Sequence, residues 1–270
     1  MPNMHPTSIV HDGALIGNDV SIGAYSIIGP NVILGDGITI HPHVVISGHT
    51  SIGKDSNIYS FASIGFPPQD LKHSDDITYL VIGERCLIRE NVTIHSGTIT
   101  GNSITKIGND CFFMVSAHIA HDCIIGNNVV LINQATLAGH TEIGDYAIIG
   151  GLSALHQHVR IGKHAFVAGM TGVEQDLIPF GIAKGVLRRC QLSGLNLIGL
   201  KRRDFSKETI SLLRACYKTI FNGHNSEIID RTKMVLNEYP NVAEVSDLAN
   251  FILDKPNRNL CLPSDKNIIK

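Results

Sequence analysis

The sequence lacks both a strong excess of charge and a long run of apolar residues. Its 270 residues carry a formal net charge of −2, so the composition gives no indication of nucleic-acid binding. No apolar stretch approaches the roughly 20 residues that a membrane-spanning helix needs. Residues 1–8 also lack the basic and apolar layout of a signal peptide. We therefore expect a soluble, cytoplasmic protein with no stable membrane insertion and no nucleic-acid partner.

Paired cysteines are also absent. The six cysteines lie at positions 86, 111, 123, 190, 216 and 261, and no two of them form a C-x-x-C motif. The sequence therefore implies no disulfide framework. Cys86, Cys111 and Cys123 fall on the small inward position of the repeat described next, so we expect them to be core residues.

What the sequence does have is an aliphatic or aromatic residue at every sixth position. The series runs from Val10 to Ile64 and from Ile82 to Ile94, then continues with its phase shifted by one residue from Ile107 to Val173. A small or β-branched residue often lies four positions later. Neither the helical period of 3.6 nor the strand period of 2 predicts a strict six. Each unit therefore sends one large and one small side chain inward, and three units form a triangular coil of about 18 residues.

This beat is typical of the hexapeptide repeats of left-handed parallel β-helices. The left hand comes from that resemblance, because the general preference for right-handed crossovers predicts the opposite. We expect an all-β left-handed parallel β-helix over residues 1–185, with loops that project from it at 66–81 and 97–106.

The chain after Pro179 has a helical rather than a six-residue period. We expect residues 186–270 to form a C-terminal α-helical subdomain. Its predicted helices cover 206–222 with Ser206 as N-cap and Asn222-Gly223 as stop, about 226–238, and about 242–254. The polar tail 255–270 is expected to be loosely ordered.

Five histidines in the later coils lie off the inward positions. They are His95, His118, His121, His140 and His156. His121 and His140 are 19 residues apart, about one coil, so the stack lines imidazoles along one edge. A neutral imidazole can act as a general base near pH 7. A zinc site would need three converging imidazoles, and His118 and His121, three residues apart in an extended chain, point to opposite sides. We therefore expect no metal.

Longer motifs resemble one enzyme family. The stretches 117–123 and 133–140 are similar to the UDP-N-acetylglucosamine O-acyltransferases, which begin lipid A biosynthesis. Further matches lie at 69–72, 93–95, 148–151, 154–157 and 199–203, so the resemblance covers about residues 5–260. It implies transfer of a 3-hydroxyacyl chain from acyl carrier protein to the 3-hydroxyl of UDP-N-acetylglucosamine. The phosphopantetheine of the carrier would deliver the chain, with no other cofactor.

The resemblance implies roles for three catalytic residues. His121 would be the general base, Asp122 would orient it, and the backbone N–H of Gly139 would stabilise the oxyanion. Adjacent residues of a strand face opposite ways, so the first two can pair only if the chain bends between them.

The resemblance also implies the substrate contacts. Asp70 would accept hydrogen bonds from sugar hydroxyls, and Gly169 would leave room for a long acyl chain. The other expected contacts are Gln69, Lys72, His95, His118, His140, His156, Gln157, Asn196, Arg202 and Arg203. An arginine fork suits a diphosphate because it binds two oxygens at once.

Two partners follow from the same resemblance. The acidic acyl carrier protein would face basic residues of the helical subdomain. Short outward side chains such as Ala120 and Ala138 favour packing against copies of the chain, and the family implies a homotrimer.

The chain departs from the family pattern at three places. Ser96 stands where arginine is usual, Ile198 stands where an acidic residue is frequent, and 185–196 is unlike the common pattern. These departures leave open whether the acceptor carries a 3-hydroxyl or a 3-amino group. An amide-forming transfer is therefore one alternative. A zinc-dependent hydratase of the same fold is a second, which the histidine spacing argues against.

Overall fold

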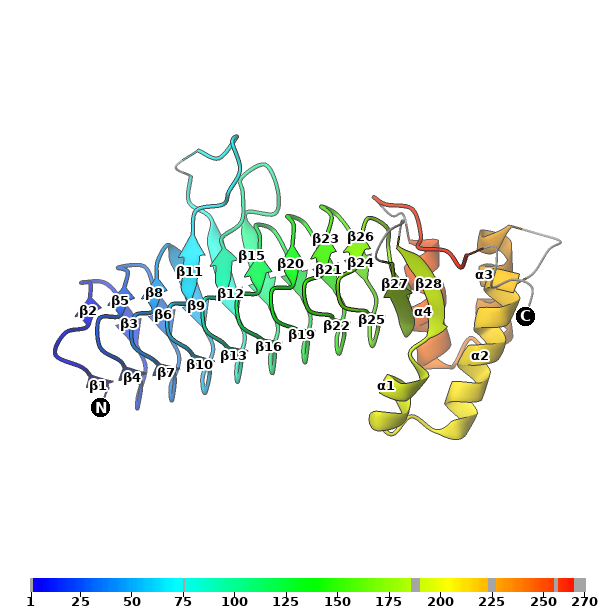
Figure 1. Ribbon diagram of the computed structural model, residues 1–270, viewed down its shortest axis with the longest axis horizontal. Coiled ribbons are helices and arrows are strands. Elements are labelled where there is room, and N and C mark those ends of the chain that lie inside the picture. Colours follow the sequence, from blue (N-terminus) through cyan, green and yellow to red (C-terminus); the bar gives the residue numbers. More distant parts are fainter. Residues whose placement is uncertain (1, 75, 186–189, 223–226, 255–256, 265–270) are drawn as a thin grey trace.

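The protein is an elongated prism of stacked coils with helices at its C-terminal end (Figure 1). The structure, a computed structural model, describes residues 2–74, 76–185, 190–222, 227–254 and 257–264. Each regular coil contributes one short strand to each of three sheets, whose neighbouring strands in the prism are parallel and three apart in chain order. This is the predicted parallel β-helix.

The three sheets are named A, B and C. Sheet A contains β1 (Asn3–Met4), β4 (Ser21–Ile22), β7 (Thr39–Ile40), β10 (Asn57–Ile58), β13 (Leu87–Ile88), β16 (Phe112–Phe113), β19 (Val130–Leu131), β22 (Ile148–Ile149), β25 (Phe166–Val167), β27 (Gly181–Lys184) and β28 (Gln191–Leu195). Sheet B contains β2 (Ile9–Val10), β5 (Ile27–Ile28), β8 (Val45–Ile46), β11 (Ser63–Phe66), β14 (Thr93–His95), β17 (His118–Ile119), β20 (Thr136–Leu137), β23 (Ala154–Leu155) and β26 (Gly172–Val173). Sheet C contains β3 (Leu15–Ile16), β6 (Ile33–Leu34), β9 (His49–Ile52), β12 (Tyr79–Ile82), β15 (Ile104–Ile107), β18 (Ile124–Ile125), β21 (Glu142–Ile143) and β24 (Arg160–Ile161).

The core is one continuous column of the residues that recur at every sixth position, which we call the on-beat residues. From Ile22 to Val173 every one of them is at most 3% exposed. Burial of each such aliphatic side chain stabilises the fold by about 2 kcal/mol. Cys86, Cys111 and Cys123 occupy the small inward position and are buried, as predicted. All six cysteines are free thiols.

Two loops interrupt the stack, and their lengths explain the phase of the repeat. Strand partners in regular coils are 18 residues apart, as in Phe112 and Val130. Across the first loop the separation is 30, between Asn57 and Leu87, and across the second it is 25, between Leu87 and Phe112. Compared with 18, the first loop therefore adds twelve residues, or two repeats. The second adds seven, one repeat and one residue, which shifts the phase.

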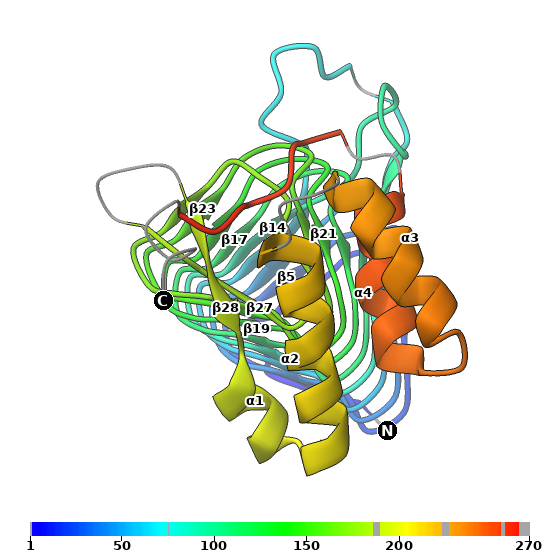
Figure 2. The same cartoon turned by 90° about the vertical axis from the view of Figure 1, so that its right-hand side faces the viewer.

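The chain turns at three edges of the prism, which we name after the sheets they join. The B–C edge includes residues 120–123, 138–141 and 156–159, the C–A edge includes 144–147 and 162–165, and the A–B edge includes 150–153 and 168–171. Both loops connect a strand of sheet B to a strand of sheet C. They therefore project from the B–C edge, at the top of Figure 2.

The C-terminal part contains the three predicted helices and one more. They are α1 (Leu197–Arg202), α2 (Lys207–Asn222), α3 (Ile228–Glu238) and α4 (Ala243–Leu253). The Oγ of Ser206 accepts a hydrogen bond from the N–H of Thr209 (3.0 Å), so Ser206 caps α2 as predicted. The expected stop at Gly223 lies outside the described residues. The short α1 and the antiparallel pair β27–β28, which ends sheet A, were not predicted, because they follow no six-residue beat.

The expectation of a loosely ordered tail is wrong for the part that the structure describes. Cys261 is fully buried, its N–H donates to the carbonyl of Asp176 (2.8 Å), and Leu192 donates to the carbonyl of Leu262 (3.0 Å). The buried Cys261, the partly buried Leu260 and a few backbone bonds anchor residues 257–264 to the end of the prism.

We predict that Phe113→Ala destabilises the protein by about 3–5 kcal/mol, because it leaves a cavity in the middle of the column. Urea unfolding would measure this. Phe113 is fully buried, whereas Phe61 is 57% exposed, so Phe61→Ala is the control and should cost less than about 1 kcal/mol. Equal losses for the two variants would contradict a core carried by the on-beat residues.

Candidate active site

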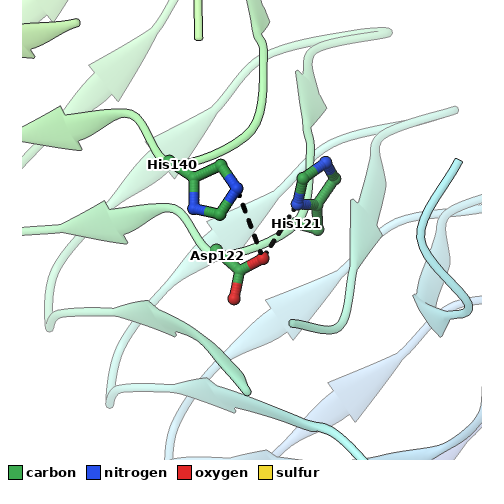
Figure 3. A group of neighbouring side chains, drawn as sticks. All are labelled: His121, Asp122 and His140. Carbon is green, nitrogen blue, oxygen red and sulfur yellow. Dashed lines mark hydrogen bonds and ion pairs between the residues drawn. The ribbon is translucent and has the colours of Figure 1, made fainter. Parts of the chain in front are cut away.

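His121 and Asp122 form a hydrogen-bonded pair on the B–C edge. Asp122 has a backbone φ of 59°, in the left-handed region. The resulting bend lets the two adjacent side chains meet, and His121 Nδ1 lies 2.8 Å from Asp122 Oδ2 (Figure 3). The condition on which the predicted pairing depended is therefore met.

The second loop holds the carboxylate of Asp122. Its oxygens accept hydrogen bonds from the N–H (3.1 Å) and Oγ1 (2.6 Å) of Thr98 and from the N–H of Asn102 (2.8 Å). Gly101 packs so closely that an added Cβ would lie 2.6 Å from the same carboxyl group. Sequence reasoning missed Thr98 and Asn102. The only signal was that their loop precedes the coil of Asp122.

These contacts determine the protonation of the pair. Burial opposes ionisation of Asp122, but the hydrogen bonds from His121, Thr98 and Asn102 outweigh it and lower its pKa below the ordinary 3.8. An ionised carboxylate only accepts hydrogen bonds. The proton of a neutral His121 ring must therefore lie on Nδ1, which leaves the lone pair of Nε2 available as a base.

Gly139 lies directly beside the imidazole of His121. A Cβ added at Gly139 would come within 2.4 Å of His121 Cε1 and 2.6 Å of Nε2, so only glycine leaves room for the ring. Among the described residues, no acceptor takes the backbone N–H of Gly139. The predicted oxyanion donor therefore lies next to the predicted base.

The edge continues with further imidazoles on both sides of the pair. His140 Nε2 lies 3.9 Å from Asp122 Oδ2, and its ring is nearly perpendicular to that of His121. His158, which was not predicted, stacks on His140 at 4.4 Å. The spacing of 18 residues would have revealed it. Burial is the main cause that lowers the pKa of His140, against the opposing charge of Asp122.

His95 and His118 lie on strands of sheet B next to the pair, His95 in β14 of the preceding coil and His118 in β17, the strand that leads into the corner of His121. Their rings meet edge to face at 5.1 Å, and His118 Nδ1 lies 2.7 Å from Thr93 Oγ1. Burial, with smaller contributions from His118 and His121, lowers the pKa of His95 to about 4. Burial also lowers the pKa of His118. His95 and His118 are therefore uncharged at neutral pH.

The first loop and the following coil bring more of the predicted contacts to this edge. Asp70 Oδ1 accepts the N–H of Lys72 (3.0 Å), and its charge is one of those that oppose the lowering of the pKa of His140. Gln69 is exposed in the same loop. His156 and Gln157 lie on the B–C edge one coil after Gly139.

Four predicted residues lie elsewhere on the prism. Gly169 is on the A–B edge, and Arg203 lies over the ring of Tyr146 (5.2 Å) on the C–A edge. Arg202, Arg203 and Asn196 line a cavity of about 750 Å³ against sheet A. The amide of Asn196 caps α1, accepting from Gly199 (3.1 Å) and donating to the carbonyl of His164 (3.0 Å). Figure 2 shows α1 on the opposite side of the prism from the loops.

One group of side chains in the described ranges could hold a metal ion. Ligand atoms of His121, Asp122 and His140 lie within 4.8 Å of one another. However, the oxygens of Asp122 already accept hydrogen bonds from four donors, which belong to Thr98, Asn102 and His121. A metal would have to displace His121 from Asp122, so the arrangement favours a hydrogen-bonded pair.

We predict that protonation of His95 destabilises the fold in acid. Its folded pKa of about 4 lies below the ordinary 6.5, so the unfolded chain binds the proton first. Stability is complete above about pH 6.5 and falls as the pH drops towards 4, by about 3 kcal/mol at most. Urea unfolding across this range should show a weaker pH dependence for His95→Gln than for wild type. An unchanged pH dependence would contradict the assignment.

No helix in the described ranges is long and apolar enough to span a membrane.

Comparison with known proteins places this arrangement in a family. The model of bacterial transferase hexapeptide repeats matches residues 13–48 and 104–139, and that of UDP-N-acetylglucosamine O-acyltransferase domain 2 matches 176–261. The prism is a left-handed parallel β-helix, as predicted.

Two curated relatives and one solved structure cover nearly the whole chain. An acyl-[acyl-carrier-protein]--UDP-N-acetylglucosamine O-acyltransferase of Azorhizobium caulinodans is 48% identical over 96% of this chain and 94% of its own length. A protein of the same name from Rickettsia bellii is 51% identical over 96% and 91%. The UDP-N-acetylglucosamine acyltransferase from Campylobacter jejuni superposes with a TM-score of 0.90 at 37% identity, covering 96% of this chain and 99% of that one. The chain therefore belongs to the UDP-N-acetylglucosamine O-acyltransferase family.

Proposed function

We propose that this protein transfers a 3-hydroxyacyl chain from acyl carrier protein to the 3-hydroxyl of UDP-N-acetylglucosamine, the first step of lipid A biosynthesis. The observation that carries the proposal is the His121–Asp122 pair, whose free Nε2 lies beside the N–H of Gly139. The names of its relatives support the choice of substrates.

The geometry supports direct transfer with general-base catalysis. His121 Nε2 takes the proton of the sugar hydroxyl while the oxygen attacks the thioester carbonyl. The N–H of Gly139 donates to the oxyanion that forms. When the carbon–sulfur bond breaks, the imidazolium returns the proton to the phosphopantetheine thiolate. Asp122 stabilises the imidazolium meanwhile.

A covalent cysteine intermediate does not fit this arrangement. Cys123 is the cysteine next to the pair in sequence, but it is fully buried in the column, and burial raises the pKa of its thiol to about 12. A neutral, enclosed thiol is a poor nucleophile. The acyl group would therefore pass directly from carrier to sugar.

A neighbouring copy of the chain would complete the site. His121 lies on the B–C edge, whereas Asn196, Arg202, Arg203 and Gly169 lie on other sides of the prism. One sugar nucleotide with its acyl chain can touch both groups only if they come from different chains. A closed ring of copies gives every chain the same contact, and the resemblance to the family implies that the ring is a homotrimer.

The helical subdomain offers a surface for the acyl carrier protein. Lys201, Lys207 and Arg214 line a groove of about 600 Å³ where α1 meets α2. Three cations suit an acidic carrier. The six free thiols suit a reducing compartment, so we expect the enzyme to act in the cytoplasm.

We predict that His121→Ala lowers kcat about 10²- to 10⁴-fold, since the general base is lost. Transfer from 3-hydroxyacyl carrier proteins to UDP-N-acetylglucosamine measures this, with the exposed His11→Ala as control. Near wild-type activity would remove His121 as the base. Transfer by the wild type only to a 3-amino UDP-sugar would establish the amide-forming alternative.

We also predict that two inactive variants restore each other in mixed oligomers. His121→Ala and the double variant Arg202→Ala/Arg203→Ala damage different halves of a shared site. Random mixing should restore about a quarter of wild-type activity, since one site in four then combines two intact halves. Failure to restore activity, in oligomers shown by mass spectrometry to be mixed, would place both halves in one chain.

A further inference from the structure

The C-terminal segment 257–264 lies against the end of the B–C edge. Beyond the bonds of Cys261 and Leu262 described above, the N–H of Asp176 donates to the carbonyl of Asn259 (2.9 Å). Cys261 Sγ lies 3.4 Å from Cys190 Sγ inside the core. This anchoring fixes the backbone that directly follows Arg258, whose side chain extends to the edge.

Arg258 contacts two of the predicted substrate residues. Its Nε donates to the carbonyl of Gln157 (2.9 Å), and its Nη2 lies 2.5 Å from Nδ1 of His156. The turn that contains Gln157 (residues 156–159) stacks on the turn that contains Gly139 (residues 138–141), because the N–H of His158 donates to the carbonyl of Gly139 (3.2 Å). Arg258 therefore holds the coil next to the oxyanion donor.

The contact with Arg258 sets the protonation of His156. A guanidinium has five N–H donors and no acceptor, and it does not lose its charge in proteins. His156 Nδ1 must therefore accept the hydrogen bond, and the proton of the neutral ring lies on Nε2. His156 and Gln157 are both exposed, so without Arg258 neither the ring nor the local backbone would have this support.

The charge of Arg258 is not used in an ion pair within the part of the chain that the structure describes, since no carboxylate oxygen there lies within 4.0 Å of its guanidinium. The nearby buried Asp176 pairs instead with Arg160 (2.7 Å). Arg258 and His156 also line a polar hollow of about 440 Å³, with Glu174 on its wall. The charge of Arg258 acts on Asp176, where it opposes the rise in the carboxyl pKa that burial causes.

We propose that Arg258 is a positioning residue for the sugar-nucleotide acceptor: it holds Gln157 in place and His156 as an Nε2–H donor. The inference rests on the proposed function, in which His156 and Gln157 contact that substrate. Loss of two such hydrogen bonds should weaken binding of the acceptor and leave the chemical step at His121 intact.

Steady-state kinetics with both substrates would test this. Arg258→Ala should raise KM for UDP-N-acetylglucosamine about tenfold, with kcat and KM for the acyl carrier protein within about twofold of wild type. Arg258→Lys keeps the charge but not the fork, so it should still raise KM severalfold. The control is Arg85→Ala, which removes an exposed arginine paired with Asp110 (2.7 Å) on the C–A edge.

Several outcomes would overturn the inference. An unchanged KM for the acceptor in Arg258→Ala, or an equal fall in kcat/KM for both substrates, would leave Arg258 a structural role only. Nitrogen-15 NMR of wild-type His156 reports the tautomer independently of any variant's folding, and a proton on Nδ1 would contradict the assignment. A wild type that does not acylate UDP-N-acetylglucosamine would overturn the proposed function itself, and this inference with it.

Discussion

The ladder of backbone hydrogen bonds between successive coils fixes the height of every side chain in this protein. Parallel strands in register are about 4.8 Å apart, and the same residue of the next coil stands directly above, 18 positions later. An edge is therefore a column of side chains at stacking distance, as the rings of His140 and His158 show at 4.4 Å. No flexible element is needed to bring the imidazoles together, and burial along the edge keeps His95, His118 and His140 neutral.

The turns at the edges convert this column into a site. A left-handed backbone at Asp122 brings two adjacent side chains into contact, which a straight strand would prevent. Glycine at 139 then leaves space for the imidazole of His121, and its own N–H has no acceptor among the described residues. The second loop supplies hydrogen bonds that keep Asp122 ionised in spite of its burial. Each of these devices depends on the rigid coil beneath it, which the aliphatic column stabilises.

The same geometry limits what one chain can do alone. A prism with three edges separates residues on different edges by the width of its core. The histidines occupy one edge, and the arginines of α1 lie on the far side. In the proposed function, a substrate that contacts both groups would lie between two copies of the chain. The C-terminal segment behaves differently, since Arg258 reaches the histidine edge of its own chain. In the proposed function, substrate recognition would therefore combine contacts within a chain with contacts between chains.

The sequence by itself determined the features that depend on local spacing. The beat of six predicted the coils, the buried Cys86, Cys111 and Cys123, and the two loops, because side-chain direction in a β-helix follows position in the repeat. The cap at Ser206 and the helical periods predicted α2, α3 and α4. Only the tertiary structure decided the rest. Four features depend on contacts between segments that share no period. They are the hydrogen bonds from Thr98 to Asp122, the separation of α1 from the histidines, the pair β27–β28 and the anchoring of Cys261. The period of the sequence indicates which way a side chain faces, whereas these contacts depend on the final position of a loop or a tail.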